Sequence, residues 1–136
     1  MLYSNQEAFD LVVEKLVAQG EPSMKEGFDN TCAYLAYNGN RCAAGHLVPD
    51  DLLKKMSNFA EDWTTVCEYV PEARKIAIQG FITELQDAHD LPVLFPVNYC
   101  NWRTGWVSKM RDVATTYRLD LTKLDDLATE EWQKNS

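Results

Sequence analysis

The chain has little of what a membrane-spanning or disulfide-framed protein needs. Its 136 residues hold only four cysteines, irregularly spaced and with no C-x₂-C pair. Charged residues interrupt every apolar stretch well short of the ~20 residues of a membrane span, and no secretory leader pattern is found. We therefore expect one soluble cytoplasmic domain over residues 1–136, with one core and free thiols.

Basic residues are also scarce. Lysine and arginine number 13 against 21 aspartates and glutamates, which leaves a formal net charge of −8. Affinity for a phosphate backbone comes from lysine and arginine that release counterions, so direct binding of nucleic acid is not expected. An acidic surface instead keeps a protein in solution and can steer it toward a basic patch on another protein. We expect no cofactor.

Helical periodicity dominates what the sequence does contain. Ser4 and Glu7 form a capping box ahead of the first apolar stripe, and the Leu91-Pro92 pair is expected to end a later helix. The expected helical ranges are 4–20, 49–58, 61–69, 71–89, 102–117 and 124–132. Asn38-Gly39 is a strong hairpin pattern and predicts two strands within residues 31–44. The predicted class is α+β, with five or six helices and one small β-hairpin.

The register of that hairpin bears on its cysteines. If Asn38-Gly39 is a two-residue turn, Leu35 faces Cys42 across the pair. Side-chain alternation then places Cys32 and Cys42 on opposite faces of the hairpin.

Residues 41–51, RCAAGHLVPDD, hold the densest group of chemically capable side chains. Cys42 with His46 or His89, oriented by Asp90 or Asp50, has the residue types of a thiol nucleophile, its base and a carboxylate. This is the alternative hypothesis of a Cys-dependent hydrolase. A nucleophilic cysteine needs an electropositive, partly exposed site, whereas Cys42 is expected to be buried. We therefore favour a protein that is not an enzyme.

The third hypothesis is a structural module that a bound zinc ion stabilises. Folding could bring Cys32, Cys42, His46 and His89 together as four ligands. Unless the turn is longer than two residues, the opposite-face argument removes Cys32 from that set, so no metal site is assigned.

Acidic residues concentrate in residues 49–72 and 119–136, whereas residues 101–118 are basic. Opposed faces of this kind suit docking on another protein, and they also suit self-association. Carboxylates spaced for exposed helix faces are the predicted partner-binding residues: Glu61, Asp62, Glu68, Glu72, Asp125, Asp126, Glu130 and Glu131.

Two motifs carry a family resemblance. They are C-x-Y followed by G-x-RCA-x-G-x-L-x-PD, from Cys32 to Asp50, and LQ-x-x-HD, from Leu85 to Asp90. Over residues 5–119 the chain resembles a family of small uncharacterised proteins from bacteriophage and prophage genomes. The resemblance implies no catalytic residues. It does imply a bacterial host cell as the setting. That setting, together with the acidic charge, predicts an anti-CRISPR-like inhibitor that occupies the basic surface of a host nuclease or defence complex.

Overall fold

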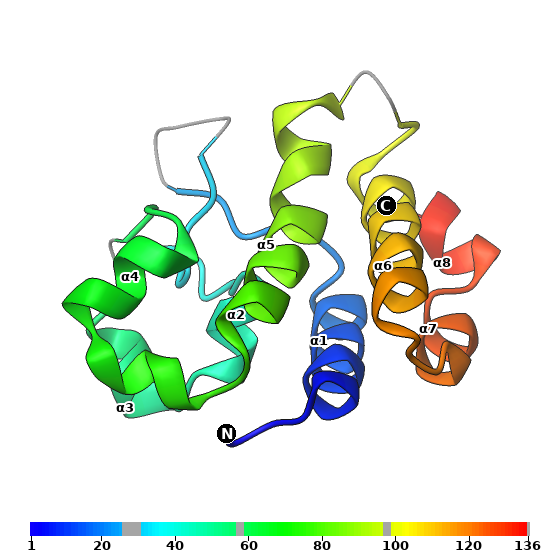
Figure 1. Cartoon of the computed structure of the whole chain (residues 1–136). Helices are drawn as coiled ribbons and strands as arrows, with labels where there is room; N and C mark the ends of the chain where they lie inside the picture. Colours follow the sequence, from blue (N-terminus) through cyan, green and yellow to red (C-terminus); the bar gives the residue numbers. More distant parts are fainter. Residues whose placement is uncertain (26–30, 57–58, 97–98, 136) are drawn as a thin grey trace.

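The computed structural model describes residues 1–25, 31–56, 59–96 and 99–135, and it is mainly helical in those ranges (Figure 1). The helices in chain order are α1 (Asn5–Gln19), α2 (Ala43–Leu47), α3 (Asp50–Lys54), α4 (Trp63–Tyr69), the 3₁₀ helix η1 (Pro71–Lys75), α5 (Gln79–Leu94), α6 (Trp102–Tyr117), α7 (Thr122–Leu127) and α8 (Glu130–Lys134). No helix of the described ranges is long and apolar enough to cross a membrane.

Helix α1 forms as its sequence predicts. The Ser4 hydroxyl accepts the Glu7 N–H and the Glu7 carboxylate accepts the Ser4 N–H, which completes the capping box. Gly20, with φ +77°, ends the helix in the left-handed conformation and donates its N–H to the Leu16 carbonyl. The stripe at the expected spacing is buried in the core and comprises Ala8, Phe9, Val12, Val13 and Leu16.

Helices α5 and α6 lie side by side in the middle of the molecule (Figure 1). Gly105 on α6 allows this approach, because a Cβ there would lie 2.8 Å from the Cβ of Pro92 on α5. The expectation that a helix ends at Leu91-Pro92 is therefore wrong. Pro92 is buried inside α5, and the helix continues to Leu94.

The long helix expected over residues 71–89 is in fact divided. The 3₁₀ helix η1 ends at Lys75, and α5 begins at Gln79. At the break, the carbonyls of Lys75 and Ile76 accept the N–H groups of Leu2 and Tyr3, 2.8 and 2.9 Å away. The N-terminal segment thus takes two carbonyls that a continuous helix would use internally.

The predicted terminal helix is also divided, with Thr129 capping α8 after α7. The helix predicted over residues 49–58 is α3 in its first part, with Asp50 and Asp51 in the first turn. The helix is shorter than predicted, because it ends at Lys54 and residues 55–56 form a turn; residues 57–58 lie outside the described residues.

The predicted β-hairpin is wrong, and so is the α+β class, because the described residues form a mainly helical fold. Within the described ranges there is no strand, and residues 31–44 contribute only to two isolated bridges, Met24 with Cys32 and Leu35 with Arg41. The Ala36 N–H donates to the Asn40 carbonyl, which leaves a three-residue turn where a two-residue turn is expected. The register therefore shifts by one, and Leu35 lies opposite Arg41 instead of Cys42.

Candidate functional site

His89 is fully buried on α5, and both of its ring nitrogens have partners. Nε2 accepts the Ser23 N–H at 3.0 Å, and Nδ1 lies 2.6 Å from Oδ1 of Asp90. A backbone N–H can only donate, so Nε2 must be the acceptor and the neutral ring carries its proton on Nδ1. The ring is thus locked in one tautomer and has no lone pair facing a substrate.

The cysteine that lies beside this histidine is Cys32. The ligating atoms of Cys32, His89 and Asp90 all lie within 4.8 Å of one another. Burial, followed by the charge of the Asp90 carboxylate and a hydrogen bond to it, raises the pKa of the Cys32 thiol far above its usual range. The thiol is protonated and is a poor nucleophile. The two-residue turn assumed above places Cys32 and Cys42 on opposite faces, and for that reason it removes Cys32 from the candidate ligands that include His89.

Cys42 has a different role. It is buried at the start of α2, where its Sγ accepts the Gly45 N–H at 3.4 Å. Burial raises the pKa of this thiol to about 12. His46 lies within hydrogen-bonding distance of Gln19, with 2.9 Å between Nε2 and Oε1. The assignment of Cys42, His46, His89 and Asp90 to catalysis stays a prediction, and this geometry gives it no activated nucleophile.

The same contacts oppose a zinc site. The proposed ligands are Cys32, Cys42, His46 and His89. The structure brings only Cys32 and His89 into one cluster, whose third member is Asp90. A metal on His89 would take either the lone pair that accepts the Ser23 N–H or the nitrogen that carries the proton. The donor set therefore does not fit a tetrahedral site.

A hollow of about 180 Å³ lies next to the cluster and shares Asp90 with it. We call it the acidic hollow; it is lined by Tyr34, Ala60, Glu61, Asp62, Trp63, Thr83, Gln86, Asp87 and Asp90. Four of these nine residues are carboxylates, and two are aromatic, with ring centroids 6.0 Å apart. The Tyr34 hydroxyl donates to the Glu61 carbonyl at 2.7 Å and so ties the segment before α4 to the aromatic wall.

Negative charge in the acidic hollow is only partly neutralised: the charge of Lys109 acts to lower the pKa of Asp87, and His89 donates a hydrogen bond to Asp90. Over the described ranges, none of its four carboxylates forms an ion pair with a lysine or arginine. Burial, and then the charges of Glu84 and Asp90, raise the pKa of Asp87. Hydrogen bonds from Thr65 lower the pKa of Asp62, which caps α4 and remains ionised. A group brought into this hollow gains most if it carries positive charge.

All eight predicted partner-binding carboxylates are exposed, but they do not form one surface. Glu61, Asp62, Glu68 and Glu72 lie on or beside α4 and η1, and Asp125, Asp126, Glu130 and Glu131 lie on α7 and α8. Figure 1 shows α4 on one side of the molecule and α7 and α8 on the other.

Local ion pairs also reduce the free charge in both groups. Glu72 pairs with Lys55 at 3.7 Å, and Asp125 pairs with Arg111 at 2.7 Å. The acidic hollow adds Asp87 and Asp90 to the α4 group. Sequence reasoning missed Asp87, because nothing in its local pattern separates it from any exposed helix carboxylate.

Comparison of the chain with models of known protein families, with curated proteins and with solved structures finds no match.

Proposed function

We propose that the protein acts by binding another protein, and that the acidic hollow receives a lysine or arginine side chain from the partner's basic surface. The observation that carries this proposal is a set of four carboxylates around one hollow, with no lysine or arginine in an ion pair with them in the described part of the chain. Carboxylates form strong charge-assisted hydrogen bonds with such a cation.

An arginine suits the hollow better than a lysine. Its planar guanidinium carries five N–H donors that can reach several carboxylates at once. Tyr34 and Trp63 line the hollow, but they are only 3% and 2% exposed and offer a guanidinium little ring surface. The preference for arginine therefore rests on the four carboxylates.

The narrower partner class rests on the family resemblance and on the net charge of −8. A phage-type protein in a bacterial host cytoplasm would act as an inhibitor, by placing its carboxylates in the basic nucleic-acid channel of a host nuclease or defence complex. Binding there competes with nucleic acid for the same cations.

The test is association kinetics with a partner captured from bacterial lysate, measured at two salt concentrations. Reversing Glu61 and Asp87 to lysine should slow association about tenfold and weaken its salt dependence, because complementary charge mainly accelerates encounter. The matched control reverses Asp126 and Glu130, which lie across the molecule. Stability should change little in either variant, since all four residues are exposed.

Three results would contradict the proposal. The control pair could slow association as much as the hollow pair, wild type could bind equally fast at both salt concentrations, or it could bind DNA or RNA as readily as protein.

A further inference from the structure

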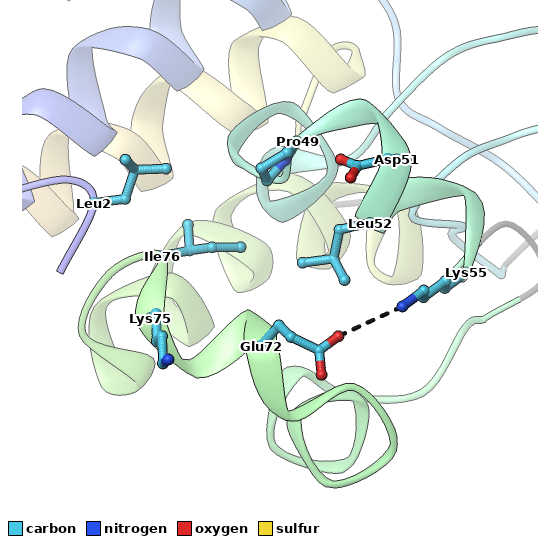
Figure 2. Close-up of a pocket in the computed structure, with 8 residues that line it drawn as sticks. All are labelled: Leu2, Pro49, Asp51, Leu52, Lys55, Glu72, Lys75 and Ile76. Carbon is cyan, nitrogen blue, oxygen red and sulfur yellow. Dashed lines mark ion pairs between the residues drawn. The ribbon is translucent and has the colours of Figure 1, made fainter.

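A second concave surface lies between the N-terminal segment, α3 and η1 (Figure 2). We call it the α3–η1 groove; it encloses about 580 Å³ and is lined by Leu2, Pro49, Asp51, Leu52, Lys55, Glu72, Lys75 and Ile76. The N-terminal segment is held along its edge, because the Leu2 N–H donates to the Lys75 carbonyl at 2.8 Å.

The groove presents apolar surface to solvent. Leu2 is 58% exposed and Leu52 is only partly buried, and the side chains of both lie over the groove beside Ile76 (Figure 2). A contiguous apolar surface rimmed by charges is typical of an interaction site.

The rim of the groove is electrically balanced, unlike the molecule as a whole. It carries two acids and two bases, while the chain has a net charge of −8. Lys55 and Glu72 pair with each other at 3.7 Å. Asp51 and Lys75 are exposed and are in no ion pair within the described ranges, and Figure 2 shows them on opposite sides of the apolar side chains.

We propose that this groove is the contact between two copies of the chain, related by a twofold axis. In such an interface, residue i of one copy meets residue j of the other, and j meets i. The opposite placement of Asp51 and Lys75 then gives two equivalent ion pairs, each joining Lys75 of one copy to Asp51 of the other. The apolar side chains between them are covered.

Charge favours a second copy over the basic partner of the acidic hollow. Two molecules of net charge −8 repel each other, so they can approach most readily where the local charge cancels. A basic surface gains nothing at a neutral rim and is drawn to uncompensated carboxylates instead. The proposal is independent of the proposed function, because it uses none of the residues of the acidic hollow.

The test is sedimentation of the full chain from about 10 µM to about 1 mM, the range in which weak pairs dissociate. Wild type should pass from monomer to dimer. Lys75→Glu and Asp51→Lys should each weaken the dimer about tenfold, because each places like charges opposite one another. The double variant should recover most of the lost affinity, since it restores both pairs with their signs exchanged. Arg74→Glu, exposed on η1, is the matched control: it changes the net charge as much as Lys75→Glu does and should weaken the dimer far less.

The two single variants also separate a specific pair from a general charge effect. Lys75→Glu makes the chain more acidic and Asp51→Lys makes it less acidic, so a net-charge effect would move the dimer in opposite directions. A wild type that stays monomeric over the whole range overturns the proposal, as would be expected if the groove binds a peptide of another protein. A double variant no better than either single variant also overturns it.

Discussion

The helix pair α5 and α6 is stabilised by different chemistry from residues 21–25 and 31–48, which hold only the short helix α2 and which we call the irregular segment. The two helices satisfy their own backbone and bury apolar side chains such as Phe81 and Trp106. The segment has no ladder of strand hydrogen bonds among its described residues and relies on side chains instead. The Ser23 hydroxyl, for example, donates to the Ala33 and Asn40 carbonyls, 2.6 and 3.1 Å away.

Neighbouring helices supply the other partners of this segment. Gln86 on α5 accepts the buried Ala44 N–H at 2.7 Å, and Gln19 on α1 bonds both the N–H and the carbonyl of Arg41. Buried backbone groups must find partners, and here polar side chains on helices take the place of a second strand. Leu85 and Gln86 are adjacent on α5 and represent the two kinds of stabilisation: apolar packing by Leu85 and a hydrogen bond to the backbone by Gln86.

The largest loss of stability is expected for a substitution in the helix pair α5 and α6. Leu85→Ala should lower the free energy of unfolding by about 3 to 4 kcal/mol, because the fully buried side chain leaves a cavity. Urea unfolding measures it. The exposed neighbour Glu84→Ala should change stability by less than about 0.5 kcal/mol. Equal losses for the two variants would show that this face of α5 is not the packed one.

The next largest loss of stability is expected in the irregular segment, where the backbone of Gly45 lies close to that of Tyr34. A Cβ on Gly45 would clash with the Tyr34 carbonyl oxygen and lie 3.1 Å from the Arg41 Cβ. Gly45→Ala should therefore destabilise by about 3 kcal/mol in thermal or urea unfolding. Gly80→Ala is the matched control: nothing lies within 4 Å of its added Cβ, and it should stabilise α5 by up to about 1 kcal/mol. A neutral Gly45→Ala would mean that the segment adapts freely.

Removal of one hydrogen-bonding side chain should lower the free energy of unfolding by less than removal of a packed apolar side chain. Gln86→Met leaves the buried Ala44 N–H without its acceptor and should lower stability by about 2 kcal/mol. Hydrogen exchange should accelerate at Ala44 more than at Leu85 if the loss is local. A loss as large as that of Leu85→Ala would remove the proposed difference between the two regions.

The smallest expected effect is the dependence of stability on pH that comes from His46. Burial, and then the charge of Arg41, lower the pKa of His46 from 6.5 to about 4. A base with a lower pKa in the folded state binds fewer protons when folded. The free energy of unfolding should therefore fall as pH drops below about 6.5 and level off below about 4, with a loss of about 1 kcal/mol by pH 5 for this partly exposed ring.

Replacement of His46 should reveal its share of that slope. His46→Gln should flatten the dependence of stability on pH between 6.5 and 4 in urea titrations. An unchanged slope in this variant would assign the dependence to other groups.

Parts of the fold and site followed from local sequence. Amphipathic spacing located α1 and α6, and a capping box located the start of α1, because a helix satisfies its own backbone and needs only one apolar face. The exposure of all eight predicted carboxylates followed from the same periodicity. Asn38-Gly39 located a turn, but local sequence did not decide its length, and one added residue changed every facing pair.

The sequence alone determined which segments form helices and where several of them begin and end. It also determined the excess of acidic groups on the surface. Only the tertiary structure decided that Pro92 continues a helix against Gly105, that Cys32 meets His89, and that Asp87 and Asp90 face the segment before α4. Helix formation depends on residues three or four apart, whereas these juxtapositions join residues far apart in the chain. They depend on packing distances and register, which no local pattern encodes.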